Sequence, residues 1–353
     1  MLKSVLSAFG INERKLIVEP FGNGLINNTW KITTSDNIYI LQRVNQLVFN
    51  SPVKISTNIN LIAAFLKEHF SQYLFVAALP ALNGETLVYD EGKGYFRLFP
   101  FIQGSHTIDV VDTPEQAYEA AKQFGQFTKL LAGFDAGLLY DTIPSFHDLS
   151  LRYQQFIDAL EKGNQQRVHQ SEQLILKIKD WSFIVRKHEE IKVNPAFKSR
   201  VTHHDTKISN VLFDDNNKAL CVIDLDTIMP GYFISDVGDM MRTYLSPVSE
   251  EEKDFSKIEI REAYYKAIAD GYYGEMKNEL TDTEKEHFFY AGTFMIYMQA
   301  IRFLTDYINN DIYYGAKYPE HNFDRAGNQV AMLEKFFKKQ PVLENYLEKA
   351  MKE

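Results

Sequence analysis

The stretch Val201-Thr-His-His-Asp-Thr-Lys-Ile-Ser-Asn-Val-Leu-Phe213, followed by Leu220-Cys-Val-Ile-Asp-Leu-Asp226, decides the fold of this chain. Two short, β-rich apolar runs enclose the turn cluster Asp214-Asp-Asn-Asn-Lys218, and this pattern predicts an antiparallel hairpin. A hairpin returns the chain to its starting level. We therefore expect Asn210, just before the first strand, to lie beside Asp224, just after the second.

Polar side chains around this hairpin have the spacing of a phosphoryl-transfer catalytic loop. Lys207 stands two residues after Asp205 and Asn210 five residues after it, as in the kinase pattern H-x-D-x-K-x-x-N. An amide oxygen on Asn210 and a carboxylate on Asp224 are hard ligands of the kind that Mg²⁺ prefers. We expect Asp205 to be the base and Asn210 and Asp224 to bind Mg²⁺. The alternative, a polar loop at a hairpin edge, does not explain why motif and hairpin occur together.

The composition is that of an ordinary globular enzyme. Hydrophobic residues make up 45% of the 353 residues and charged residues 24%, which is typical of soluble domains. The net charge is −9 without a basic block, so we expect neither a nucleic-acid partner nor an anionic membrane surface. A single cysteine, Cys221, excludes an intrachain disulfide and fits a reducing cytoplasm. None of these features predicts an oligomeric state.

The order of expected elements indicates an α+β fold with two lobes. Residues 1–103 are rich in expected strands and form the expected nucleotide-binding lobe, with a hinge at its end (residues 98–104). Residues 104–353 are rich in expected helices, with the hairpin inserted among them, and form the expected catalytic and substrate-binding lobe. This is a bilobal, protein-kinase-like architecture. The expected strands are 16–21, 29–33, 38–44, 74–77, 85–89 and 95–101. The expected helices are 52–70, 114–131 (opened by the capping box Thr113-Pro-Glu-Gln116), 149–161, 171–190, 250–273, 283–309, 325–338 and a short terminal one.

A glycine-containing loop, Phe21-Gly-Asn-Gly-Leu-Ile-Asn-Asn-Thr-Trp30, lies between the first two expected strands. Glycines let the backbone approach phosphates closely, so that its N–H groups can bind them. The loop is neither a Walker loop, since no Gly-Lys-Ser/Thr follows, nor a Rossmann turn, since a strand follows. A plain hairpin turn is the alternative. With the catalytic loop downstream, we expect nucleotide contacts from Gly22, Asn23, Gly24, Asn28 and Thr29.

The third expected strand should carry a cation over the nucleotide phosphates. It contains Tyr39-Ile-Leu-Gln-Arg-Val-Asn45, and strand alternation places Gln42 and Arg43 on opposite faces. Either could point at the nucleotide, and Arg43 could equally be a solvated or lobe-bridging charge. The following expected helix has no evident acidic partner for such a cation, because Glu68 lies near its end.

Three further polar groups accompany the catalytic stretch. Asp226 could be a second metal ligand or bind a substrate hydroxyl. In Asp236-Val-Gly-Asp239 we expect Asp236 to be buried and to cap loop N–H groups, while the role of Asp239 stays open. The segment from Arg302 to Tyr314 ends an expected helix and is suited to binding a polyol by hydrogen bonds and stacking. A solvated helix end is the alternative for that segment.

These strings resemble the aminoglycoside phosphotransferase and choline kinase superfamily, and within it the N-acetylhexosamine 1-kinases, from about residue 17 to residue 333. The likeness is carried by the glycine-containing loop, the third strand, the catalytic stretch through Pro230, the motif Ser235-Asp-Val-Gly-Asp239 and the string Arg302-Phe-Leu-Thr-Asp-Tyr307. It implies ATP and Mg²⁺ as cofactors and a small-molecule sugar as substrate. One departure is that the usual Lys or Arg of the third strand aligns with Gln42.

The resemblance also implies roles for individual residues. Asp205 would be the catalytic base, Lys207 would lie near the transferred phosphate, and adenine would contact backbone around Pro100 and Ile102. Sugar contacts would come from Asp205, Asp226, Arg302 and Tyr313. Two alternatives remain on the sequence: a kinase of choline, an amino alcohol or an aminoglycoside, and a catalytically dead nucleotide-binding module.

Overall fold

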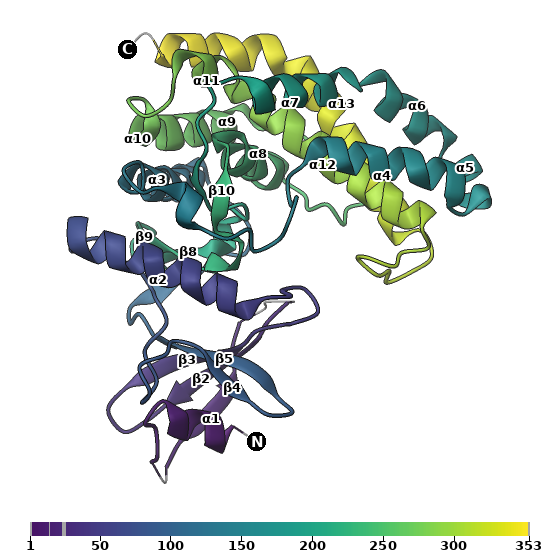
Figure 1. Ribbon diagram of the computed structural model, residues 1–353. Helices are drawn as coiled ribbons and strands as arrows, with labels where there is room; N and C mark the ends of the chain where they lie inside the picture. Colours follow the sequence, from purple (N-terminus) through teal and green to yellow (C-terminus); the bar gives the residue numbers. More distant parts are fainter. Residues whose placement is uncertain (1, 14, 23–25, 352–353) are drawn as a thin grey trace.

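The computed structural model describes residues 2–13, 15–22 and 26–351. A five-stranded sheet occupies one end of the molecule with the N-terminus, and helices fill the other end with the C-terminus (Figure 1). The predicted α+β class is confirmed, with a sheet-rich N-terminal part and a helical C-terminal part.

The N-terminal sheet is antiparallel throughout, in the order β1-β2-β3-β5-β4. Helix α1 (Lys3–Ala8) covers one face, because side chains that alternate along the strands meet it there. This small core consists of Val5, Leu6, Ile32, Leu41, Phe96 and Leu98. The strands are β1 (Ile17–Pro20), β2 (Asn28–Thr33), β3 (Ile38–Arg43), β4 (Val88–Asp90) and β5 (Gly94–Pro100).

The strand expected at 74–77 is wrong, because that segment is irregular. It pairs with no strand in the described chain. Instead Phe75 stacks on Phe127 of helix α3, with ring centroids 6.3 Å apart and planes 3° apart. The apolar run therefore serves packing against the helices.

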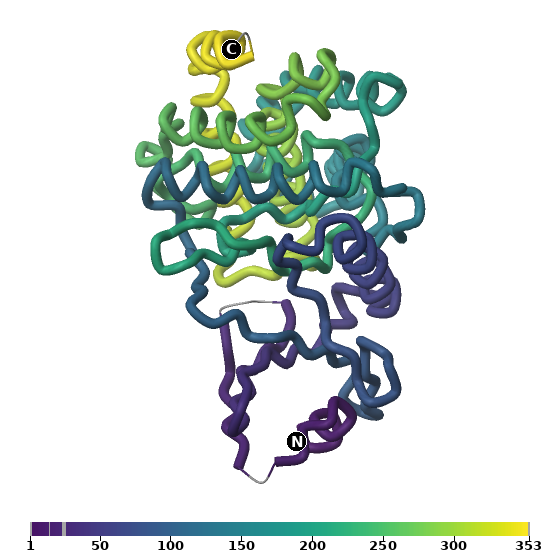
Figure 2. The backbone as a smooth tube through the Cα atoms, turned by 90° about the vertical axis from the view of Figure 1, so that its left-hand side faces the viewer, coloured from purple at the N-terminus to yellow at the C-terminus, as the bar shows by residue number. Residues whose placement is uncertain are grey.

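Helix α2 (Pro52–His69) packs on the helical part and not on the sheet. Its buried residues Ile55, Ile59 and Ile62 recur every three or four positions and join the large core, as expected of an amphipathic helix. The buried Asn58 amide donates to the carbonyl oxygens of Tyr140 (2.8 Å) and Ile228 (2.9 Å). Both views place α2 between the sheet and the other helices (Figures 1 and 2). The division at residue 103 remains a prediction, and the large core extends across it.

The helical part is built around α12 (Phe288–Ile308), which is buried on nearly all sides. A helix that is apolar all round belongs in the interior of a large core. No helix in the described part of the chain is both long and apolar enough to cross a membrane. The other helices are α3 (Pro114–Leu130), α4 (Leu149–Lys162), α5 (Gln165–Gln170), α6 (Glu172–Asp180), α7 (Phe183–Val193), α8 (Phe233–Tyr244), α9 (Glu262–Ile268), α10 (Gly274–Met276), α11 (Asp282–Glu286) and α13 (His321–Ala350).

Several helix boundaries differ from expectation. The capping box at Thr113 is present, but the helix expected at 171–190 is split into α6 and α7. The helix expected at 250–273 begins only at Glu262, because Glu250 lies in a loop where it pairs with Arg242 and Arg325. Helix α13 continues through Pro341 to residue 350 as one element. Helix α8 was not expected, since its Asp-Val-Gly-Asp core suggests a loop.

Small strands place the catalytic stretch against these helices. They are β6 (Ser105–His106), β7 (Arg200–Thr202), β8 (Val211–Asp214), β9 (Ala219–Val222) and β10 (Met229–Gly231). Strand β7 pairs with β10, and β8 pairs with both β6 and β9. The 3-10 turns are η1 (Ala136–Leu138), η2 (Ile208–Asn210), η3 (Leu225–Thr227) and η4 (Phe255–Lys257), and η5 (Ala269–Tyr273) is π-helical.

Candidate active site

The predicted hairpin is present. Strands β8 and β9 are antiparallel with Val211 opposite Val222. The Ile223 N–H donates to the Asn210 carbonyl oxygen over 2.8 Å. This bond joins the two ends of the hairpin, and it brings Asn210 next to the segment that carries Asp224.

Asp205 sits between a cation and an amide. The Lys207 ammonium lies 3.0 Å from Oδ1 of Asp205. The Asn210 Nδ2 donates to the Asp205 carbonyl oxygen (2.9 Å) and to its Oδ2 (3.1 Å). Because the amide nitrogen of Asn210 is held in this way, its Oδ1 remains an acceptor for another group.

Helix α8 holds the catalytic loop from behind through two buried aspartates. Asp236 accepts the backbone N–H groups of His203 (3.0 Å) and His204 (2.7 Å), which is the capping role predicted for it. Asp239 accepts the N–H of Thr206 over 2.9 Å. Burial, opposed by the two N–H donors, raises the pKa of Asp236 to about 7. The loop backbone is therefore fixed on both sides of Asp205.

Backbone strain occurs at two positions beside the catalytic residues. His204 has φ of 65° and Asp224 has φ of 58°, a region that non-glycine residues adopt rarely and mostly at functional sites. The His204 ring lies 2.7 Å from the Thr202 hydroxyl and, through its other nitrogen, 3.3 Å from His147. These contacts hold the left-handed turn that precedes Asp205.

The donor set of the expected metal site fits a hard cation. The Asp224 carboxyl is open to solvent although protein atoms surround it on most sides. Desolvation, followed by the charges of Asp226 and Asp205, raises its pKa to about 7. A carboxylate in an excess of negative charge, together with the available Oδ1 of Asn210, suits Mg²⁺.

The expected nucleotide contacts lie along β2, β3 and the loop between β1 and β2. Gln42 donates to the Thr29 hydroxyl over 3.3 Å, so these two side chains share one face of the sheet. Arg43 is opposite Asn28 in register and on the other face of β3, where it is exposed. Gly22 has φ of 77°, which favours glycine. Asn23 and Gly24 lie outside the described residues.

Sequence reasoning missed Arg97 on β5. Its Nε and Nη2 donate to Oε1 of Gln42 over 2.9 and 2.5 Å. Its Nη2 also lies 2.5 Å from Oδ1 of Asp226, whose Oδ2 accepts the Asn27 amide at 2.8 Å. Asp226 is thus buried between two groups of the N-terminal part. One sequence feature could have singled out Arg97: it is the one charged residue within Gly94-Tyr-Phe-Arg-Leu-Phe99.

The expected adenine contacts lie where β5 leaves the sheet. Pro100 is opposite Tyr39 in register, and the Ile102 carbonyl oxygen accepts the Ser105 hydroxyl at 2.6 Å. Both residues are half-buried. Their backbone leads directly into β6 and the helical part.

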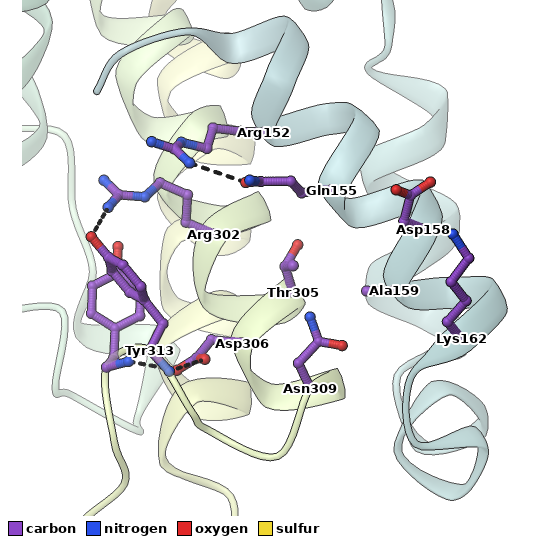
Figure 3. A pocket seen from close by; sticks show the side chains of 11 residues that line it. Arg152, Gln155, Asp158, Ala159, Lys162, Arg302, Thr305, Asp306, Asn309 and Tyr313 are labelled. Carbon is purple, nitrogen blue, oxygen red and sulfur yellow. Dashed lines mark hydrogen bonds between the residues drawn. The ribbon is translucent and has the colours of Figure 1, made fainter. Parts of the chain in front are cut away.

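A cavity of about 470 Å³ lies between α4, the end of α12 and the loop after it (Figure 3). Two residues expected to contact the sugar line it, Arg302 on α12 and Tyr313 on the loop. Nη2 of Arg302 lies 3.4 Å from the Tyr313 hydroxyl. Its lining is Arg152, Gln155, Asp158, Ala159, Lys162, Arg302, Thr305, Asp306, Asn309, Tyr313 and Tyr314.

A chain of side-chain contacts connects the Arg302 end of this cavity with the catalytic loop. The Arg302 guanidinium lies 5.6 Å from the centre of the Phe146 ring, which stacks on His147 at 4.4 Å. His147 in turn contacts His204, the residue before Asp205. Three successive side chains, Phe146, His147 and His204, therefore connect the Arg302 end of the cavity with the expected base.

Two arginines in this cavity lack a carboxylate partner among the described residues. Arg152 bonds Gln155 and the carbonyl oxygens of Ser145 and Phe146, and Arg302 bonds neutral groups. Burial and then the charge of Arg302 lower the pKa of Arg152, so the two guanidinium groups repel each other.

The nearest acidic residue on α12 does not neutralise them. Asp306 accepts the backbone N–H groups of Tyr313 (2.7 Å) and Tyr314 (2.9 Å) and the Asn322 amide. It fixes the loop after α12 instead. The cavity lining is rich in donors, and its three cations, Arg152, Lys162 and Arg302, exceed its carboxylates, Asp158 and Asp306, by one formal charge.

Comparisons with known proteins agree with this geometry. Residues 17–276 match the model of a family described as the phosphotransferase enzyme family (APH). The chain belongs to this family. It is therefore a phosphotransferase, as the resemblance implied.

Solved structures share its fold at low sequence identity. A microcompartment-associated aminopropanol kinase is 15% identical with a TM-score of 0.65, covering 97% of each chain. A spectinomycin phosphotransferase, solved with ADP and spectinomycin, is 14% identical with a TM-score of 0.58, covering 96% of this chain and 97% of that one. The choline kinase LicA from Streptococcus pneumoniae is 11% identical with a TM-score of 0.52, covering 94% and 97%. These neighbours show the kinase-like fold.

Proposed function

We propose that this phosphotransferase uses ATP and Mg²⁺ to phosphorylate the anomeric hydroxyl of an N-acetylhexosamine, giving the sugar 1-phosphate. The observation that carries the choice of acceptor is the pair Arg152 and Arg302, which line this cavity and have no carboxylate partner among the described residues. Two guanidinium groups repel a quaternary ammonium or a polyamine, whereas they donate hydrogen bonds to hydroxyl and acetamido oxygens. The pair thus favours a neutral, oxygen-rich acceptor over choline or an aminoglycoside.

The tyrosine at the edge of this cavity supports the same acceptor. Tyr313 is 70% exposed, and its ring meets that of Tyr314 edge-on at 4.8 Å. An exposed aromatic ring held in place by its neighbour offers an apolar surface to one face of a sugar. Arg302 would then bind ring substituents from the side, since its guanidinium reaches the Tyr313 hydroxyl.

Asp205 is proposed to orient the attacking hydroxyl and to accept its proton. Phosphoryl transfer has a loose transition state, so alignment and charge neutralisation provide most of the acceleration. Asn210 fixes the Asp205 carboxylate through the 3.1 Å bond to Oδ2, and α8 fixes the backbone around it. Asp205 is therefore held in place before substrate binds.

Lys207 and the metal ligands are proposed to act on the phosphate side. The Lys207 side chain is half exposed, and it can swing from Asp205 to a γ-phosphate oxygen as charge develops there. Mg²⁺ would be held by Asn210 Oδ1 and Asp224, and it would neutralise charge on the β- and γ-phosphates. Asp226 is proposed to serve the nucleotide side, since its carboxylate faces Arg97 and Asn27.

The decisive experiment measures ADP release from ATP and Mg²⁺ over a panel of free N-acetylhexosamines, other hexoses, choline, amino alcohols and aminoglycosides. Phosphorus NMR then assigns the phosphorylated position. We expect turnover with N-acetylglucosamine or N-acetylgalactosamine and an acid-labile 1-phosphate product. Turnover confined to a cationic acceptor would refute the acceptor assignment and leave the phosphotransferase intact. ATP binding without turnover of any acceptor would favour a binding module.

A further inference from the structure

The N-terminal sheet brings an arginine to the catalytic loop from an unexpected strand. On β5, Phe96 and Leu98 point into the small core under α1, so Arg97 between them points to the opposite face. There it is 4% exposed and lies beside Asp226 of the catalytic stretch. Arg97 therefore lies close to the expected metal and phosphate site.

Kinases usually place a lysine on β3 and pair it with an acidic residue on the following helix. Neither member of that pair is in its usual position here. β3 carries Gln42 at the position facing the catalytic loop, and the one acidic residue of α2, Glu68, lies in its last turn. Both chemical functions are nevertheless present, because Arg97 provides the cation and Asp226 provides the carboxylate 2.5 Å away.

We propose that Arg97 is the side chain that binds the nucleotide phosphates in this enzyme, and that Gln42 and Asp226 are its positioning residues. Gln42 stands opposite Arg97 in register, and its Oε1 accepts both Nε and Nη2. Nη1 makes no hydrogen bond to the described residues, so it is available to donate to a phosphate oxygen. A planar guanidinium fixed on one edge presents its other edge in a defined direction.

Arg43 does not compete for this role. It lies on the face of β3 opposite to Gln42, and it is exposed. Arg43 is therefore the matched control: it is the same residue type, on the same sheet, aimed away from the catalytic loop. The inference depends on the phosphotransferase activity but not on which acceptor is used.

The first test is equilibrium binding of ATP, ADP and adenosine by calorimetry, without acceptor. In Arg97→Met we expect ADP and ATP to bind about 10- to 100-fold more weakly, the worth of one charge-assisted hydrogen bond, while adenosine binding is unchanged. Arg43→Met should leave all three unchanged. Equal weakening of adenosine and ADP, or no weakening of ADP, would overturn the proposal.

The second test moves the charge back to β3. Gln42→Lys added to Arg97→Met places a cation on the neighbouring strand beside Asp226, and ADP affinity should recover by about 10-fold. A purely structural role for Arg97 predicts no recovery. If Arg97→Met proves unstable on thermal unfolding, Arg97→Lys keeps the charge and serves instead, and it should weaken ADP but not adenosine.

The two proposals fail in different ways. If wild-type protein binds no ATP, the nucleotide function itself is refuted. If ADP binding follows the pattern above but no N-acetylhexosamine is turned over, only the acceptor assignment fails.

Discussion

The catalytic loop and the cavity around Arg302, proposed to bind the acceptor, are built in opposite ways. The loop around Asp205 is held by buried aspartates of α8 and by the hairpin, so its geometry depends on many backbone bonds. The cavity around Arg302 and Tyr313 is lined mostly by exposed or half-buried side chains of α4, α12 and the loop after α12. On the proposed function, the catalytic groups are held by backbone bonds, whereas the choice of acceptor depends on a few side chains that can change without disturbing the fold.

The largest effect should come from the loop. Asp205→Asn keeps the shape of the side chain but removes the base, so we expect kcat to fall by about 10²- to 10⁴-fold with ATP binding retained. The measurement is ADP release at saturating substrates. Asp215→Asn, in the exposed turn of the same hairpin, is the control and should be neutral. Near-normal turnover of Asp205→Asn would show that another group takes the proton.

The cavity should respond in acceptor affinity alone. Arg302→Met is expected to lower kcat/KM for the sugar by about 10- to 100-fold, because a hydrogen bond from a charged group is lost, with KM for ATP unchanged. Lys162→Met, at the far end of the same cavity (Figure 3), is the control. If both variants lost the same activity, the cavity as a whole rather than its arginine end would bind the acceptor.

A further change tests whether α8 supports the loop. Asp236→Asn replaces one accepting oxygen by an amide that cannot accept the N–H of His203 or His204. We expect a loss of about 1–3 kcal/mol in the free energy of unfolding by urea, together with a lower kcat. Asp282→Asn, on an exposed helix end, should stay within about 0.5 kcal/mol. A stable but inactive Asp236→Asn would instead point to a direct role in chemistry.

The smallest effect concerns acid stability away from both regions. His188 is buried and stacks on Phe294 at 5.2 Å, with Asp148, Glu189 and Lys192 nearby. Burial lowers its pKa from 6.5 to about 4. Between these values the unfolded chain binds more protons, so stability is complete above pH 6.5 and falls as the pH drops toward 4.

Between pH 6 and pH 5 this histidine should cost about 1 kcal/mol of unfolding free energy. His188→Leu should flatten the pH dependence of urea unfolding in that range. His169→Gln, an exposed histidine, should not. An unchanged slope in His188→Leu would mean that other groups cause the acid sensitivity.

Much of the loop could be predicted from sequence because its parts are local. Asp205, Lys207 and Asn210 lie within six residues, and the turn cluster fixes the return to Asp224. The same holds for the capping box at Thr113, whose bonds span four residues.

Long-range partners could not be predicted in this way. Arg97 is 129 residues from Asp226, and nothing in the local pattern of β5 indicates that a glutamine on β3 leaves room for it. Likewise Arg152 and Arg302 come together only because α4 packs on α12. Helix α8 was missed because its aspartates and glycine favour loops locally, whereas burial against α12 and bonds to the catalytic loop stabilise it as a helix.

The attachment of α2 to the large core predicts that α2 moves with the helices and not with the sheet. The sheet and α1 share the small core that includes Leu41 and Leu98, whereas Asn58 and the buried isoleucines tie α2 to the helices. Amide hydrogens of α2 should therefore exchange with deuterium at the slow rate of the helical part, and those of the sheet faster and together. On that exchange pattern the chain crosses the boundary between sheet and helices three times, between β3 and α2, between α2 and β4, and after β5, and Arg97 moves with the sheet relative to Asp226.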